Sequence, residues 1–228
     1  MKIVVTNLSG NVGKTVCSRD LLLYRCDGYK LVTIESINGD GTEETVITGD
    51  NHLEIFSQVL LEDDLILDIG SSNVEQFLIT AKEEPEIIES IDLFIIPTTT
   101  GIKEQKDTVK TVLELLDFNV PSEKIKIIFN KVEKNDTIDN QFSSLIKALN
   151  KIDIEFDIEL FINKHDLYSD DKSLNNLISD RDFKSEMIEA KNKGDADKAK
   201  KLSYAYAKSK KAISLNQKYQ YIFDKITA

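Results

Sequence analysis

The sequence predicts an α/β fold, a doubly wound and mainly parallel sheet with helices on both faces, followed by a helical C-terminal region. Strand-like and helix-like segments alternate along the first two thirds of the chain. Parallel strands need such helical crossovers between them. The strand-like segments are also short and nearly all apolar, which is typical of strands that helices cover on both faces. In such sheets ligands bind beyond the carboxyl ends of the strands, so we expect the chemistry in the loops that follow them.

Six strands are expected, because short runs of β-branched and other apolar residues recur, several of them ending in Gly, Asn, Asp or Ser. These runs are Lys2–Asn7, Lys30–Glu35, Leu65–Ile69, Asp92–Pro97, Lys124–Asn130 and Ile158–Ile162. Between them, apolar residues recur at helical spacing. The expected helices are Lys14–Tyr24, His52–Leu61, Val74–Ala81, Lys103–Phe118 and Ile138–Leu149. The sheet is therefore expected to belong to one α/β domain over residues 1–165.

Residues 166–228 are expected to form a mostly helical extension packed on that core. Asp195–Ile213 is rich in Ala and Lys, which favours a helix. The net charge of the chain is −11, yet residues 181–211 hold ten basic and five acidic residues. The acidic remainder should repel nucleic acid and anionic membranes. The eight lysines of Lys191–Lys211 indicate either a solvated helix face or weak, non-specific DNA contact.

We expect a cytoplasmic protein without stable membrane insertion. No uninterrupted apolar run approaches the ~18 residues of a membrane span. A strand-like segment begins at Lys2, which leaves no room for a signal peptide. The two cysteines, Cys17 and Cys26, give no disulfide framework and suit a reducing compartment.

Phosphate binding is predicted for the loop between the first strand and the first helix. The predicted contacts come from Ser9, Gly10, Asn11, Val12, Gly13, Lys14, Thr15 and Val16. Glycines let backbone N–H groups turn toward an anion, Lys14 would contact the β and γ phosphates, and the Thr15 hydroxyl would bind Mg²⁺. The full Walker A pattern has a glycine where this chain has Leu8. The alternative is therefore a glycine turn that caps a helix.

Asp68 is the second candidate metal ligand. It ends the apolar run Leu65–Leu67, and a carboxylate at the tip of a buried strand beside a phosphate loop is placed to bind Mg²⁺ directly or through water. The alternative is an aspartate that caps the next loop.

Asn130 closes the fifth strand and is the candidate contact for the base. Its amide offers both a donor and an acceptor to a purine edge. An aspartate in place of Glu133 would argue for guanine, so adenine, and hence ATP, is favoured. A turn-initiating asparagine is the alternative.

Several of these stretches together resemble known proteins. The phosphate loop, the Asp68 strand, Ile95–Pro97 and Phe129–Lys131 are similar to the ParA/MinD branch of P-loop ATPases. More narrowly, four stretches resemble the plasmid stability protein StbB family: Asn7–Thr15, Glu35–Asn38, Asp68–Glu75 and Gln105–Thr108. The resemblance covers residues 1–150 well and the C-terminal third weakly.

This resemblance implies a P-loop NTPase fold and a cytosolic, plasmid-encoded protein that binds ATP and Mg²⁺. Such proteins act in plasmid stability, partition or positioning, and in some systems in conjugation. They form nucleotide-dependent homodimers and work with a small DNA-binding partner encoded beside them.

The chain departs from its relatives at the residues that support hydrolysis. Where ParA/MinD loops carry a signature lysine the chain has Ser9, and where they carry a second glycine it has Asn11. Of the two aspartates that follow the second strand in ParA-type enzymes, the counterparts here are Glu35 and Ile37. Losing such charged contacts lowers the rate of phosphoryl transfer more than ground-state binding.

The predicted catalytic residues are accordingly Lys14 and Asp40. Asp40 follows the second strand on a Gly-flanked loop and could orient the attacking water, as could Glu44. We therefore expect a slow Mg²⁺-dependent ATPase. The alternatives are a nucleotide-gated interaction module with little or no hydrolysis, and a metabolic P-loop ligase, for which the sequence shows no further catalytic motif.

Overall fold

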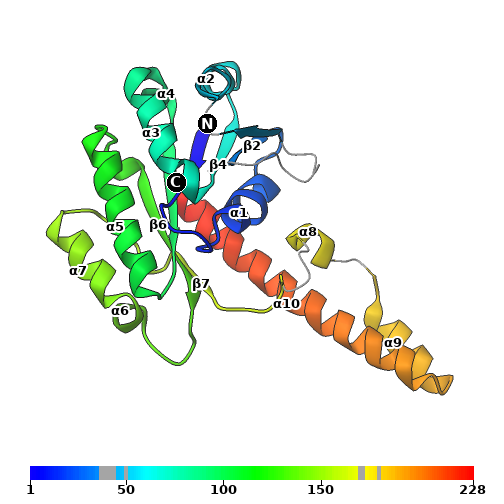
Figure 1. Ribbon diagram of the computed structural model, residues 1–228. Coiled ribbons are helices and arrows are strands. Elements are labelled where there is room, and N and C mark those ends of the chain that lie inside the picture. Colours follow the sequence, from blue (N-terminus) through cyan, green and yellow to red (C-terminus); the bar gives the residue numbers. More distant parts are fainter. Residues whose placement is uncertain (36–44, 49–50, 169–172, 179–180) are drawn as a thin grey trace.

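The computed structural model describes residues 1–35, 45–48, 51–168, 173–178 and 181–228 (Figure 1). Its centre is a seven-stranded sheet in the order β3-β2-β4-β1-β5-β6-β7, and every neighbouring pair is parallel. The predicted parallel sheet is thus confirmed. The strands are β1 (Lys2–Val5), β2 (Lys30–Glu35), β3 (Thr45–Thr48), β4 (Leu65–Ile69), β5 (Leu93–Thr98), β6 (Ile125–Val132) and β7 (Phe161–Asn163).

Two strands differ from the prediction. The edge strand β3 was not expected, because four residues beside polar loops carry too short a pattern, and only pairing with β2 defines it. The last strand lies at Phe161–Asn163 rather than at Ile158–Ile162, and its pairing with β6 is irregular between Phe129 and Val132.

Alternate residues of each strand point to opposite faces, and each face is buried. In β1, Val4 packs into the larger core cluster, whereas Ile3 and Val5 pack into the second one. The larger cluster joins the sheet to α2 (His52–Leu61), α3 (Val74–Glu83), α4 (Glu86–Ser90), α5 (Ile102–Asp117) and α7 (Ser143–Lys151). The short helices η3 (Ser71–Asn73), η4 (Ser122–Lys124) and α6 (Ile138–Gln141) complete the connections.

The opposite face is covered by segments from both ends of the chain. The first helix, predicted as one unit, consists of α1 (Lys14–Val16), a π-helical segment η1 (Cys17–Leu22) and a 3₁₀ turn η2 (Leu23–Arg25). Beside it pack α8 (Leu174–Leu177) and the last half of α10 (Ala196–Ile226), with Tyr219 fully buried. The C-terminal helix therefore touches the helix that follows the phosphate loop.

Helix α10 is much longer than the predicted Asp195–Ile213, because the apolar residues of its second half are buried by the sheet. Its first half extends beyond the sheet together with α9 (Phe183–Asn192), and the two form a projecting hairpin (Figure 1). The hairpin has a small core of its own, built from Ala190, Ala199 and Leu202.

Candidate nucleotide-binding site

A cleft of about 750 Å³ opens at the carboxyl edge of the sheet. One end is formed by the predicted phosphate loop, from Gly10 to Val16. Asn130, in β6, lines the cleft next to this loop, and the other end is formed by residues that follow β7, among them His165 and Tyr168. The location agrees with the rule that ligands of such sheets bind beyond the strand ends.

The phosphate loop is held in shape by two residues with left-handed backbone conformations. Gly13 has φ 100°, and an added Cβ there would lie 2.3 Å from Nδ2 of Asn130. Asn11 has φ 58°, a conformation that asparagine tolerates better than most side chains. This explains how Asn11 can stand where relatives carry a glycine.

Lys14 is buried at the base of the loop. Its ammonium donates to the carbonyl oxygens of Ser9, at 2.9 Å, and Asn7, at 3.3 Å. An ammonium has three donors, so one remains for a phosphate oxygen. Burial lowers the pKa of Lys14, and the nearby carboxylates of Asp68 and Glu35 partly oppose this shift. The arrangement places a positive charge where the β and γ phosphates are predicted.

The two predicted metal ligands occupy different positions. Thr15 is exposed and lines the cleft, whereas Asp68 is 2% exposed and lies beneath it. Both offer the oxygen ligands that Mg²⁺ prefers. Among the described residues, no group of three or more His, Cys, Asp or Glu side chains could hold a metal ion by itself. The donors therefore fit an Mg²⁺ that is shared with nucleotide phosphates, which Asp68 would reach through a water molecule.

The side chains of Ser9 and Val12 do not face the cleft. Both are buried, and the Ser9 backbone N–H donates to Oδ1 of Asn7 at 2.7 Å. Any contact they make with a phosphate would come from the backbone.

Asn130 lines the cleft and also supports the phosphate loop. Its Nδ2 donates to the carbonyl oxygen of Val12 at 2.8 Å, and its Oδ1 accepts the backbone N–H of Lys131, also at 2.8 Å. Lys131 adds a third link, from its ammonium to the carbonyl oxygen of Asn11. The amide keeps a second N–H, so contact with a purine edge stays a prediction.

The sequence singled out Glu35 only as the counterpart of a ParA-type aspartate, and it did not predict that Glu35 or the segment after β7 lines this cleft. Glu35 lines it, and the carboxylate lies so close to Gly70 that an added Cβ there would approach Oε2 to 2.5 Å. Its position at the carboxyl end of a buried strand was a usable signal.

At the far end, the rings of His165 and Tyr168 lie 5.1 Å apart, edge to face. Burial lowers the pKa of His165 and raises that of Tyr168, so both rings are uncharged at pH 7. No sequence pattern pointed to this pair. The predicted water-orienting residue Asp40, with Ile37 and Glu44, lies outside the described residues.

No protein-family model and no curated protein sequence matches the chain. Among solved structures, it is similar to a protein described as a plasmid partition protein of Borrelia burgdorferi B31, bound to AMPPNP. That match has a TM-score of 0.54 at 14% identity and covers 98% of each chain.

Two further structures are similar over much of their length. McdA from Cyanothece, as a variant in complex with ATP, is 14% identical with a TM-score of 0.49, over 94% of this chain and 96% of that chain. The MinD cell division protein of Aquifex aeolicus is 14% identical with a TM-score of 0.45, over 74% and 84%. The Borrelia match shows that the chain shares the fold of that protein, and the all-parallel sheet with its helical C-terminal region agrees with the predicted architecture.

Proposed function

We propose that the protein is a ParA-like, Mg²⁺-dependent ATPase that acts in plasmid stability, partition or conjugation. The observation that carries the proposal is the buried Lys14 ammonium at the phosphate end of the cleft. The fold shared with a plasmid partition protein solved with AMPPNP supports nucleotide binding. The resemblance of Asp68–Glu75 to the StbB family supports a role in plasmid stability.

In the proposed complex, Lys14 and the loop backbone hold the phosphates, and Thr15 and Asp68 hold Mg²⁺. When bound, Mg²⁺ neutralises charge on the β and γ phosphates. The nucleoside then extends toward Asn130 and the His165–Tyr168 pair, whose uncharged rings offer apolar surface to a base. Adenine is the proposed base. We assign this work to residues 1–165, the proposed nucleotide-binding domain, with Tyr168 added from the helical extension formed by residues 166–228.

Hydrolysis is proposed to be slow without a partner. Ser9 is 1% exposed, so it cannot replace a cationic contact to the phosphate of a second subunit. Three carboxylates are candidates for orienting water: Asp40, Glu44 and the cleft-lining Glu35. The test is steady-state turnover of the parent, Asp40→Ala and Glu35→Gln, each alone and with the product of the neighbouring gene.

We expect the parent to turn over well below the ~1–10³ s⁻¹ of metabolic enzymes and to be stimulated by the partner. Fast turnover of the isolated parent would refute the slow-enzyme proposal. A variant that keeps full stimulated turnover removes its residue from the mechanism.

A nucleotide-dependent homodimer and a small DNA-binding partner complete the proposal, together with a cytoplasmic location. No helix among the described residues is long and apolar enough to cross a membrane. Light scattering after gel filtration should show a dimer with AMPPNP and Mg²⁺ and a monomer with ADP. A monomer under both conditions would refute the proposed nucleotide-dependent dimer.

The second candidate is a nucleotide-gated interaction module without turnover. The burial of Ser9 and the presence of Ile37 in place of an aspartate favour it. It predicts nucleotide-dependent binding of the partner with no phosphate release, even when partner and DNA are both present.

A further inference from the structure

A second cavity, of about 520 Å³, adjoins the nucleotide cleft. The two share the segment Asn163–Asp166, which follows β7 and forms a wall between them. The rest of its lining comes from α10, between Lys211 and Lys218, from Leu167, and from Lys134 in the loop after β6. The function proposed above uses His165 from the shared segment and none of the lysines of this cavity.

Lysines dominate its lining. Four of its ten lining residues are lysines, and they come from separate segments of the chain: Lys134, Lys164, Lys211 and Lys218. The one carboxylate in the lining is Asp166. This local positive charge contrasts with the net charge of the chain, which is −11.

The ion pairs at this cavity leave its ammonium groups available. Lys164 pairs with Glu133 at 2.6 Å, and Lys211 pairs with Asp166 at 3.3 Å. The side chains of these two pairs are between 47% and 76% exposed. Exposed pairs of this kind contribute little stability and exchange readily for other partners. Lys134 is exposed and has no ion pair within the described part of the chain.

Lys218 contributes a fixed positive charge. Its ammonium donates to the carbonyl oxygen of Glu159 at 3.0 Å and lies 3.9 Å from the centre of the Phe161 ring. One anchored lysine and three exposed lysines therefore supply positive charge to the same lining. Compact ammonium groups on flexible stems suit phosphate as point charges.

We propose that this cavity is a second anion site, which binds the phosphate group of a small molecule beside the nucleotide. The volume suits a phosphate ester or pyrophosphate, whereas a DNA duplex is too wide to enter. Because the Asn163–Asp166 wall is shared, an occupant would contact the same segment that borders the nucleoside end of the first cleft.

Calorimetry with inorganic pyrophosphate tests the site directly. The parent is first saturated with Mg·ADP, so that the phosphate loop is filled, and pyrophosphate is then titrated at constant ionic strength. We expect one further site, at least tenfold weaker in Lys134→Ala/Lys211→Ala, with ADP affinity unchanged. The matched control is Lys147→Ala/Lys151→Ala on α7, which removes the same charge away from the cavity and should bind as the parent does.

Lys14→Ala separates this inference from the proposed function. It should bind nucleotide at least tenfold more weakly than the parent and keep pyrophosphate binding at the second cavity. If Lys14→Ala abolishes all pyrophosphate binding, pyrophosphate binds only at the phosphate loop and the second site is refuted, while the proposed function stands. Equal pyrophosphate affinity in Lys134→Ala/Lys211→Ala and the parent would also overturn the site. A parent that binds pyrophosphate but no nucleotide would overturn the proposed function and leave the second site intact.

Discussion

Lys14 illustrates the conflict that the proposed phosphate site would impose on a single residue. Burial disfavours its charged form and lowers its pKa, yet a phosphate needs that charge. Two backbone carbonyls and the neighbouring carboxylates compensate in the folded chain. The compensation keeps the ammonium poised at the cleft, and a bound triphosphate would strengthen it further.

Lys14→Ala should weaken Mg·ATP binding at least tenfold, about 1.4 kcal/mol, because the ammonium charge that would contact the β and γ phosphates is lost. Isothermal titration calorimetry measures the change, with Lys147→Ala as a control for loss of a surface lysine. Unchanged affinity in Lys14→Ala would contradict the phosphate-loop assignment.

Asp68→Asn should leave nucleotide binding without Mg²⁺ largely intact and remove the gain in affinity that Mg²⁺ gives, because an amide is a poorer partner for the metal and its water. The measurement is nucleotide affinity with and without Mg²⁺. Asp117→Asn, at the far end of α5, serves as the control. The same Mg²⁺ dependence in Asp68→Asn and the parent would reduce Asp68 to a structural role.

Gly13→Ala should destabilise the protein more than Gly28→Ala does. Both glycines have positive φ, which costs a side chain about 1–2 kcal/mol. Only at Gly13 would the new Cβ also collide with Asn130, whereas nothing lies within 4 Å at Gly28. Thermal unfolding compares the stability of the two variants. Equal losses of stability would show that the Asn130 side chain moves aside with no loss of free energy.

At the scale of elements, the decisive contact joins the helix after the phosphate loop to α10. Arg25 donates to the carbonyl oxygen of Asp20, at 2.8 Å, and to both oxygens of Asn216 on α10. Buried Asp20 accepts the backbone N–H of Leu174 at 3.0 Å. The hydroxyls of Tyr168 and Tyr219 meet at 3.3 Å, so a cleft-lining residue also touches α10. The C-terminal helix is thus tied to the nucleotide site from two directions.

Arg25→Ala should therefore lower the free energy of unfolding by about 1.5–3 kcal/mol, as expected for lost hydrogen bonds from a charged, partly buried donor. Denaturant unfolding measures the loss. Lys225→Ala, which breaks exposed ion pairs with Asp157 and Glu159, should change stability little. Equal effects of the two substitutions would show that Arg25 does not anchor α10.

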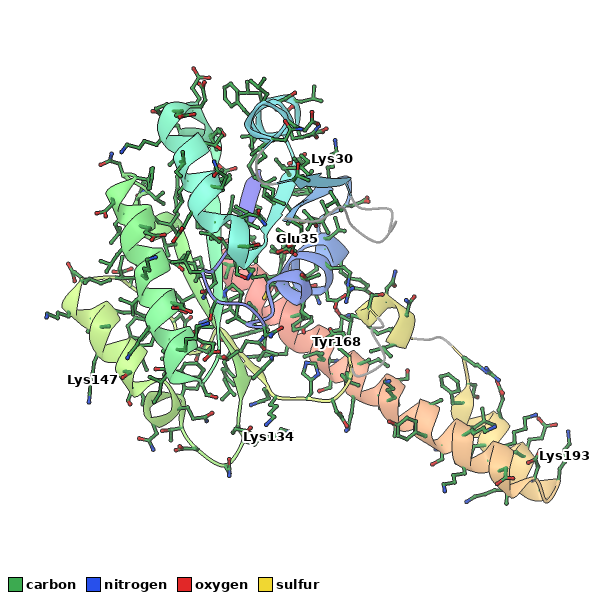
Figure 2. All side chains as sticks on the ribbon, viewed as in Figure 1. Lys30, Glu35, Lys134, Lys147, Tyr168 and Lys193 are labelled. Atoms are coloured by element: carbon green, nitrogen blue, oxygen red, sulfur yellow. The ribbon has the colours of Figure 1, made fainter. Side chains whose placement is uncertain are left out.

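At the scale of the whole molecule, charge is divided between an acidic sheet domain and a basic projecting hairpin (Figure 2 labels Lys193 near its tip). The hairpin lysines can neutralise DNA phosphates, but the acidic domain opposes a close approach. Binding to DNA should accordingly be weak and confined to low salt.

Replacing the eight lysines of Lys191–Lys211 by glutamine should abolish binding to a DNA duplex of arbitrary sequence, because those lysines supply the phosphate contacts. Fluorescence anisotropy measures the binding at about 50 and about 200 mM salt, because phosphate contacts weaken strongly over this range. Binding that survives the substitutions would move the DNA contact elsewhere, and no binding by the parent would leave the hairpin as a solvated surface.

Much of the architecture followed from local patterns. The strand containing Asp68 and the loop containing Lys14 are contiguous stretches, so composition and spacing sufficed to predict them. The edge strand β3 could not be predicted, since four residues define a strand only through their partner β2. The extra length of α10 was missed for a similar reason: its polar and aromatic second half is stabilised by packing on the sheet.

The sequence by itself determined the parallel α/β sheet, the place of Asp68 in β4 and the place of Lys14 at the start of the helix after β1, because these depend on residues close together in the chain. Only the tertiary structure decided that Glu35, His165 and Tyr168 join the same cleft and that Asn130 supports the phosphate loop. It also decided that lysines from separate segments surround a second cavity. Such groupings arise from strand order and helix packing, which bring distant residues together without leaving a local pattern.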